Sequence, residues 1–204
     1  MLNLPNSITL TRIALVVVFT IAISVTPDYR VGYPVALLAF LLAAFSDWLD
    51  GYLARKLQEV TTFGKLIDPL ADKIAVSAAF IYLTSVDACP AWATILIITR
   101  EFLVTGIRQI AQEHGIIIAA DRTGKWKTAF QLAFCTGTLL YLTVKSYPNV
   151  AAPLVWLAGL CAPSGSHAWL YPLLLWGAII LTAWSGIAYC IGARKFLFQE
   201  RQQP

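Results

Sequence analysis

The chain has 204 residues, of which 58% are hydrophobic and 13% are charged, and its mean hydropathy is +0.69. This composition excludes an ordinary soluble domain and indicates an all-α integral membrane protein, for which we expect no nucleic-acid partner. The four cysteines lack metal-ligand spacing and only two histidines are present, so neither a zinc site nor a histidine base is expected.

The apolar runs predict six transmembrane helices of about 20 residues with short connections, and therefore one domain over residues 1–204. Residues 2–7 are expected to form a short N-terminal interfacial helix, with Asn6 or Ser7 capping the first span. The first run lacks a preceding basic region and a convincing cleavage site, so we interpret it as a permanent helix rather than a signal peptide. The second span starts near residue 33, and the others cover about residues 8–25, 66–83, 92–110, 128–143 and 171–191.

Two details of the chain order follow from helix geometry and bilayer thickness. Pro69 is expected in the first turn of the third span, where a proline is tolerated because its missing N–H has no partner there anyway. The fifth connection contains a further apolar stretch, residues 150–160, which is too short to cross a bilayer comfortably.

The basic residues are unevenly divided between the two sides of this topology. Only Arg30 and Lys145 fall on one side, and Lys73 is left inside a span. The positive-inside rule then makes the other side cytoplasmic, together with both termini and the acidic stretch described next. The remaining twelve of the fifteen are Arg12, Arg55, Lys56, Lys65, Arg100, Arg108, Arg122, Lys125, Lys127, Arg194, Lys195 and Arg201.

Four aspartates, of the eleven acidic residues in the chain, lie in a polar stretch that runs from the end of the second span into the third. Asp47 and Asp50 are three residues apart, and Asp68 and Asp72 are four apart, so each pair shares one face of a helix. The short connection makes these two helices antiparallel neighbours. Uncompensated carboxylates are costly in an apolar setting, whereas clustered hard oxygen ligands suit magnesium or manganese. We therefore predict a metal site.

Three residues inside this stretch fit a phosphate ligand beside the metals. Gly51 and Ala54 have little or no side chain, which permits close approach of a ligand to the helix. Arg55 can offer a planar, charged fork to a phosphate.

A set of salt bridges is the alternative interpretation. The same stretch holds five acids, the four aspartates and Glu59, against the four bases Arg55, Lys56, Lys65 and Lys73. That near-balance does not explain why two helices each carry an aspartate pair at helical spacing with small residues between them.

The pattern from Asp47 to Asp72, D-x2-D-G-x2-A-R-x8-G-x3-D-x3-D, resembles the signature of the CDP-alcohol phosphotransferase family without a departure. The resemblance implies six transmembrane helices, two divalent metal ions (Mg²⁺ or Mn²⁺) between the carboxylates, and displacement of CMP from a CDP-linked lipid by an alcohol. It also suggests a homodimer.

The resemblance assigns roles to matching positions of this chain. Asp47 and Asp68 would touch both metals, Asp50 the first and Asp72 the second. Asp72 would also be the general base. The CDP group of CDP-diacylglycerol would be held by Gly51, Ala54, Arg55 and the Thr61 hydroxyl.

Two residues near the start of the chain are further candidates for contact with CDP-diacylglycerol. Asn6, Thr9 and Arg12 are spaced by three residues and share one broad face near the start of the first helix. Ligand contact by Asn6 and Thr9 is one interpretation. Helix capping with a snorkelling Arg12 is the other.

Looser motifs elsewhere resemble a bacterial branch of the family, the phosphatidylglycerophosphate synthases, whose acceptor alcohol is glycerol 3-phosphate. That resemblance implies a multi-pass enzyme of the bacterial cytoplasmic membrane, and it covers roughly the first 130 residues. The motifs are Asn3-Leu4-Pro5-Asn6 with Thr9 and Arg12, Arg100-Glu101-Phe102-Leu103-Val104 with Arg108, and Gly124-Lys125-Trp126-Lys127-Thr128.

The basic residues independently favour an anionic acceptor. Arg100 and Arg108 lie in the fourth span, while Lys125 and Lys127 precede the fifth. Several cations beside an acidic metal site suit a phosphate such as that of glycerol 3-phosphate, whereas inositol or serine would need fewer. Ordinary cytoplasmic positive charge that contacts anionic membrane lipids is the competing explanation.

The sequence therefore predicts transfer of a phosphatidyl group from CDP-diacylglycerol to glycerol 3-phosphate. A related transferase with another acceptor, such as inositol phosphate, inositol or serine, is the nearest alternative. A membrane carrier with an acidic cation site is the non-enzyme alternative, but the carboxylates lie near the ends of the spans rather than at mid-membrane. A disulfide between Cys89 and Cys161, both expected on the non-cytoplasmic side, also stays open.

Overall fold

The computed structural model of the chain describes residues 4–24, 29–57, 62–113 and 122–199. Within these ranges it describes the backbone, but not the side chains, of residues 4–8, 47–57, 62–69, 72, 112–113, 122–123 and 193–199. The described ranges form seven helices and contain no strand. These are α1 (Leu4–Ser24), α2 (Tyr29–Leu57), α3 (Thr62–Ser85), α4 (Ala91–Glu113), α5 (Arg122–Lys145), α6 (Ala152–Gly159) and α7 (Leu170–Gln199).

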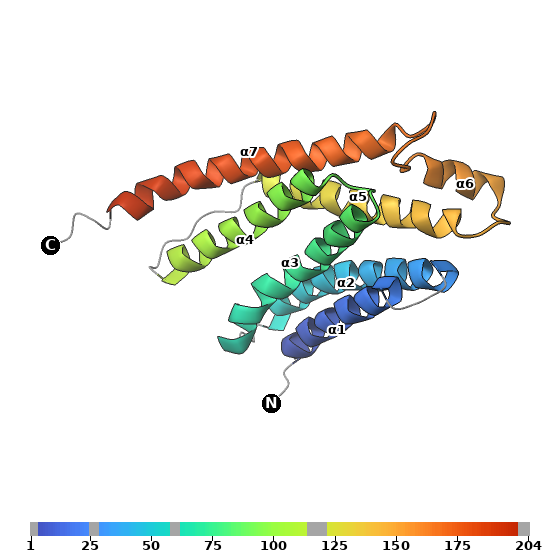
Figure 1. Cartoon of the computed structure of the whole chain (residues 1–204). Coiled ribbons are helices and arrows are strands. Elements are labelled where there is room, and N and C mark those ends of the chain that lie inside the picture. The colour runs from blue at the N-terminus through green and yellow to red at the C-terminus, as the bar shows by residue number, and fades with distance from the viewer. Residues whose placement is uncertain (1–3, 25–28, 58–61, 114–121, 200–204) are drawn as a thin grey trace.

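The six long helices run back and forth along one bundle (Figure 1). The start of α1, the end of α2 and the end of α4 lie towards the left of that view, as does the end of α7. The described connections from α3 to α4 and from α5 through α6 to α7 lie at the opposite end. This alternation matches the antiparallel order predicted for the six long apolar runs. It places Arg30, at the start of α2, and Lys145, at the end of α5, at the same end of the bundle.

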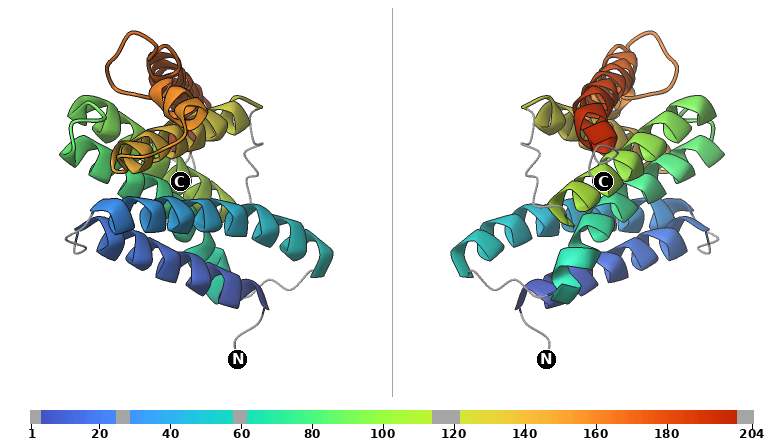
Figure 2. Two further views of the ribbon diagram at one scale, coloured as in Figure 1. Left: turned by 90° about the vertical axis from the view of Figure 1, so that its right-hand side faces the viewer. Right: turned by 90° about the vertical axis from the view of Figure 1, so that its left-hand side faces the viewer.

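Helix α5 occupies the centre of the arrangement. It contacts α2, α3, α6 and α7, while α1 packs on α2 and α3. Turning the molecule shows α1 and α2 on one side and α7 on the other, with α5 between them (Figure 2). In the described part of the chain, α4 contacts α3 and α7 but has no close backbone contact with α5. The space between α4 and α5 is therefore left to side chains.

Aromatic and small residues form the core of the bundle. The rings of Phe80 and Phe134 stack with centroids 5.6 Å apart, joining α3 to α5. Fully or almost fully buried alanines, among them Ala36, Ala39 and Ala79, let neighbouring backbones approach closely. Small residues at contacts of this kind are typical of helices that associate in a membrane.

The helix ends correct two predictions. Residues 4–7 form the first turn of α1, so the separate interfacial helix with a cap at Asn6 or Ser7 is not found there. Pro5 fits this early start because the first helical N–H groups have no intrahelical partner. Helix α3 begins at Thr62, which places Pro69 in its interior rather than in its first turn.

The predicted short apolar stretch is confirmed as α6, a helix of 8 residues. At about 1.5 Å per residue it is far too short to cross a bilayer of about 30 Å. The open question about cysteines is also answered, because Cys89 and Cys161 are both free thiols.

The exterior of the bundle is apolar. Two helices contain windows long and apolar enough to cross a membrane, residues 29–46 of α2 and 170–192 of α7, and only about a third or less of each window is buried. Helices α4 and α5 are interrupted by charged and amide side chains that face inward, as described below. Exposed large apolar side chains occur on α1, α2, α3, α4, α6 and α7, for example Val17, Leu38, Ile81, Ile95, Trp156 and Ile187.

A glycine contact between α5 and α7 gives a first prediction. A methyl group at Gly177 would overlap the ring of Phe130, which the bundle holds between these helices. We expect Gly177→Ala to destabilise the protein by about 1–3 kcal/mol through overpacking. The matched control is Gly192→Ala in the same helix, where nothing lies within 4 Å of the added methyl group. Denaturant unfolding of purified protein in detergent compares them, and equal stability of the two variants would contradict this packing.

Candidate active site

The four signature aspartates lie on two helices that contact each other. Asp47 and Asp50 belong to α2, and Asp68 and Asp72 belong to α3. Both pairs lie within continuous helix, so the predicted spacing of each pair on one helical face holds for the backbone. The described side chains contain no cluster of three metal-ligating groups, but the side chains of these aspartates lie outside that description.

The side chains of the remaining signature residues also lie outside the description. Gly51, Ala54 and Arg55 lie in the last two turns of α2, with side-chain positions outside the description. Thr61 lies wholly outside the described residues, and Asn6 is described only as part of the α1 backbone. Their roles toward CDP-diacylglycerol stay predictions.

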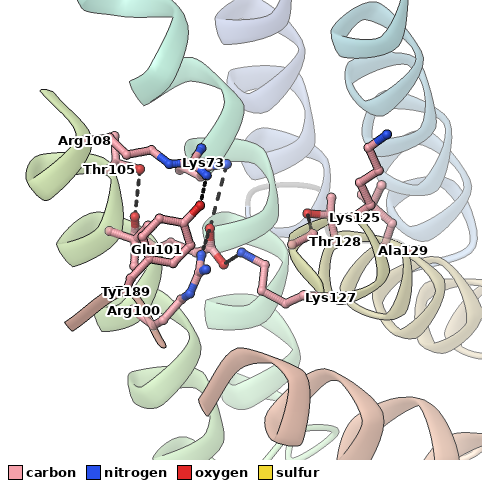
Figure 3. A pocket seen from close by; sticks show the side chains of 13 residues that line it. Lys73, Arg100, Glu101, Thr105, Arg108, Lys125, Lys127, Thr128, Ala129 and Tyr189 are labelled. Atoms are coloured by element: carbon pink, nitrogen blue, oxygen red, sulfur yellow. Dashed lines mark hydrogen bonds and ion pairs between the residues drawn. The ribbon is translucent and has the colours of Figure 1, made fainter. Parts of the chain in front are cut away.

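A cavity of about 500 Å³ opens between α3, α4, α5 and α7 (Figure 3). It is lined by all four basic residues that the sequence assigned to the acceptor phosphate, and by Lys73 of α3 in addition. Segments far apart in the chain thus bring five cations to one volume. The five are Lys73, Arg100, Arg108, Lys125 and Lys127.

A smaller cavity of about 160 Å³ adjoins the first and shares Lys73 and Glu101 with it. Ala43 and Ala44 of α2 line it, and they precede Asp47 by about one helical turn. Lys73 follows Asp72 directly in α3. The smaller cavity therefore borders the parts of α2 and α3 that carry the aspartates, and it shares residues with the cationic cavity.

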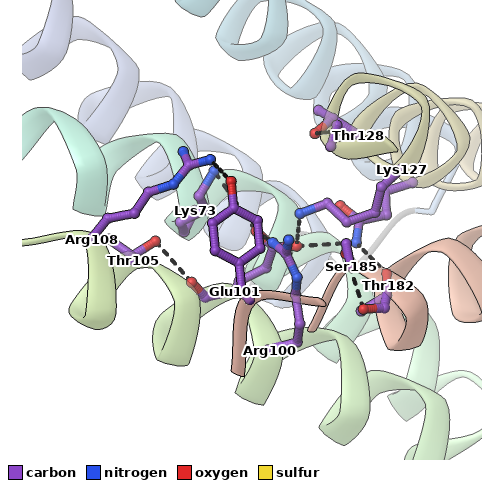
Figure 4. A network of polar contacts seen from close by, with 12 residues as sticks. Lys73, Arg100, Glu101, Thr105, Arg108, Lys127, Thr128, Thr182 and Ser185 are labelled. Carbon is purple, nitrogen blue, oxygen red and sulfur yellow. Dashed lines mark hydrogen bonds and ion pairs between the residues drawn. The ribbon is translucent and has the colours of Figure 1, made fainter. Parts of the chain in front are cut away.

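Glu101 is the only acidic residue among the described residues that line the larger cavity. Its carboxylate is buried and forms ion pairs with Lys127, with Lys73 at 3.8 Å and with Arg100 at 3.6 Å. Gln131 donates hydrogen bonds to Oε1 at 3.3 Å and to the Thr182 hydroxyl at 3.1 Å. Figure 4 shows Glu101 among its three cations. One carboxylate thus joins α3, α4 and α5 across the gap between α4 and α5.

Lys127 differs from the other cations in a way that the sequence did not indicate. Its side chain is only 4% exposed and its ammonium group is paired with Glu101 Oε1. An ammonium group committed to a buried carboxylate is less available to a ligand than an open one. Lys125, two residues earlier, is exposed and points away from Glu101 in Figure 3.

Tyr189 of α7 contacts both arginines of the cavity, Arg100 and Arg108. Its ring lies against both guanidinium groups, with its centroid 4.9 Å from Arg108 Cζ and 5.6 Å from Arg100 Cζ. Arg108 also donates a hydrogen bond to the Tyr189 hydroxyl. Gly186, one turn earlier, leaves room for the Arg100 side chain, because a methyl group there would come within 3.1 Å of Arg100 Cγ.

At the chain start, Thr9 and Arg12 are buried within the bundle. Arg12 lines the smaller cavity together with Lys73 and Gln131. Its guanidinium therefore lies inside the bundle rather than snorkelling to an interface, which corrects that interpretation. Thr9 is not among the residues that line either cavity.

Sequence reasoning missed several residues of this site. Lys73 and Glu101 carried a usable signal, since an ionisable residue inside a predicted span indicates a functional role by default. Gln131 and Tyr189 carried none, because an amide or a tyrosine in an apolar helix is equally typical of packing. Their helices meet at the cavity only in the folded bundle.

A sequence profile of the CDP-alcohol phosphatidyltransferase family matches residues 2–184. The chain belongs to this family. The match spans the aspartate signature and nearly all of the cavity wall, but it ends before Tyr189.

Curated relatives with one shared name support a narrower placement. The chain is 49% identical over 151 residues to the CDP-diacylglycerol–glycerol-3-phosphate 3-phosphatidyltransferase of Bacillus subtilis, covering 69% of this chain and 78% of that one. It is 33% identical over 205 residues to the enzyme of that name from Haemophilus influenzae, covering 98% of each. The Rickettsia felis enzyme of that name is 30% identical over 194 residues, 95% of this chain and 97% of the relative.

Proposed function

We propose that this member of the CDP-alcohol phosphatidyltransferase family transfers the phosphatidyl group of CDP-diacylglycerol to glycerol 3-phosphate, giving phosphatidylglycerol phosphate and CMP. The observation that carries the choice of acceptor is the cavity with five basic residues and one acid, which suits a small phosphate-bearing alcohol. The names of relatives that cover nearly the whole chain support the same reaction.

The four carboxylates are a donor set that fits divalent metal ions, since short oxygen ligands on neighbouring helices suit Mg²⁺ or Mn²⁺. Asp47, Asp50, Asp68 and Asp72 would hold these ions. When bound, the ions would neutralise the pyrophosphate and stabilise charge on the departing CMP.

The residues of the chain divide the remaining work. Arg55, with Gly51, Ala54 and Thr61, holds the CDP group. The acceptor hydroxyl attacks the phosphorus that carries the diacylglycerol, its proton passes to the Asp72 carboxylate, and the bond to the CMP oxygen breaks. The cationic cavity holds the acceptor phosphate so that the hydroxyl is presented to this reaction.

The long helices are proposed to be six transmembrane spans of one domain in the bacterial cytoplasmic membrane, with both termini and the active site facing the cytoplasm. The alternation of the helices and the position of Arg30 and Lys145 away from the cationic cavity support this orientation. A site at the membrane surface suits a reaction between a two-chain lipid and a water-soluble acceptor.

An acceptor panel tests the reaction directly. Purified protein in CDP-diacylglycerol micelles with Mg²⁺ or Mn²⁺ is expected to release CMP when glycerol 3-phosphate is added, and not when the chelator EDTA removes the metal. Inositol, inositol phosphate and serine are expected to give little release. Preference for one of these three would assign the chain to a sister activity, and CMP release from none of the four would contradict a transferase.

A further inference from the structure

Three of the five cations that line the large cavity, Lys73, Arg100 and Lys127, are paired with a single carboxylate. Five basic side chains line this cavity and Glu101 is the one acid among the described residues that do so. A buried carboxylate is costly unless it is paired and hydrogen-bonded, and Glu101 has ion pairs on both oxygens and accepts hydrogen bonds on Oε1. The cluster still carries excess positive charge, which suits an anionic ligand.

The two oxygens of Glu101 have different partners. Oε1 accepts from Lys127 and from Gln131, both of them buried. Oε2 lies 3.8 Å from Lys73 Nζ and 3.6 Å from Arg100 NH1, distances at which the charges attract without a short hydrogen bond. An ammonium group has three N–H donors and a guanidinium has five, so Lys73 and Arg100 keep donors for a ligand in the cavity.

We propose that Glu101 is a positioning residue for the acceptor: its Oε2 holds Lys73 and Arg100 at the cavity wall, where they bind the acceptor phosphate. Its Oε1 meanwhile anchors the carboxylate to α5 through Lys127 and Gln131. The inference rests on the proposed function and deepens it, because it adds Lys73 to the acceptor site and assigns Lys127 to its support.

The placement of Lys73 gives this arrangement a second consequence. Lys73 follows Asp72 in α3, while Glu101 belongs to α4. The ion pair between them holds this part of α3 against α4. It therefore fixes the acceptor-binding cations relative to the helix that carries the proposed base, which is what correct presentation of the hydroxyl requires.

The competing role for Glu101 is that of a simple counter-ion for buried Lys127. Removing the carboxylate alone would leave that ammonium buried and unpaired, which destabilises a protein strongly. Removing both charges together avoids this penalty. If Glu101 were only a counter-ion, the double variant would bind the acceptor normally. If Glu101 is a positioning residue, Lys73 and Arg100 would still lose the carboxylate that holds them at the cavity wall.

The experiment compares Glu101→Gln, the double variant Glu101→Gln/Lys127→Met and a charge-matched control, Asp87→Asn. Asp87 is exposed in the connection between α3 and α4 and has φ 55°, a conformation that asparagine tolerates. For each purified protein, KM is measured for glycerol 3-phosphate and for CDP-diacylglycerol in turn, together with the unfolding temperature.

We expect the double variant to fold. Its KM for glycerol 3-phosphate should rise by about tenfold or more, because Lys73 and Arg100 are no longer held where they contact the phosphate. Its KM for CDP-diacylglycerol should match that of Asp87→Asn and the unmodified protein. An unchanged acceptor KM, or an equal rise for both substrates, would overturn the positioning role. If the unmodified protein did not use glycerol 3-phosphate, the proposed function itself would fail, and that result is separate.

Discussion

Asp68→Asn is expected to abolish CMP release from CDP-diacylglycerol while leaving the helical bundle folded. Asp68 is one of the four proposed metal ligands, and an amide oxygen lacks the negative charge with which a carboxylate would hold a divalent ion. Asp47→Asn should be equally severe. Helix content and unfolding temperature in detergent should stay close to those of the unmodified protein without metal, because these side chains serve the reaction rather than the core.

The metal assignment also has a readout that does not depend on turnover. A ligand that binds only the folded state stabilises it by about 2.7 kcal/mol at a hundredfold excess over its Kd. We expect Mg²⁺ or Mn²⁺ to raise the unfolding temperature of the unmodified protein and of the control Asp87→Asn, but not of Asp68→Asn. Full activity of Asp68→Asn in saturating metal would refute the assignment.

Asp72→Asn should behave differently from the other ligand variants. If Asp72 is the general base, its loss stops transfer more than it weakens lipid binding. Retention of CDP-diacylglycerol should therefore be better in Asp72→Asn than in Asp47→Asn. A defect confined to lipid affinity would show that another group takes the proton.

The second large effect is expected at Arg108, whose guanidinium lines the cavity beside Tyr189. A charged hydrogen bond to phosphate contributes about 1.5–3 kcal/mol, so Arg108→Ala should weaken the apparent affinity for glycerol 3-phosphate roughly ten- to a hundredfold. Use of CDP-diacylglycerol should change little. Arg55→Ala should show the opposite pattern, because Arg55 is assigned to the CDP group.

Kinetics with each substrate varied in turn measure this split. Arg30→Ala is the matched control, since it removes one arginine charge from an exposed position that does not line the cavity. Equal damage to both substrates in Arg108→Ala would indicate a structural role for its contact with Tyr189. A small effect on both would remove Arg108 from the acceptor site.

The lengths of the apolar runs in the sequence were sufficient to predict the helices. Six long apolar runs became six long helices, and the short run at residues 150–160 became α6, because helix length and bilayer thickness leave few alternatives. Helix starts were less predictable. Helices α1 and α3 begin at Leu4 and Thr62, about four residues before the predicted spans, because a helix can begin before the apolar run by which a span is recognised.

The cavity could be predicted only in outline. Residue type suggested the cations at Arg100, Arg108, Lys125 and Lys127, and the fold brings all of them to one volume. Pairing among side chains could not be read from spacing, because Glu101 and Lys127 meet through helices without close backbone contact. The sequence therefore provided no reason to separate Lys127 from the other three predicted phosphate ligands. In the structure, Lys127 is buried and paired with a carboxylate.

The last helix has a consequence for how the enzyme is made. The aspartate signature is complete by residue 72, but the cavity wall is closed by Tyr189 of α7, which packs on α4 and α5. If the long helices are the proposed transmembrane spans, they enter the membrane in the order of their synthesis. The four aspartates of a growing chain are then in place before Arg100 and Arg108 contact Tyr189. We therefore expect the proposed acceptor site to form only in chains whose final helix is in place.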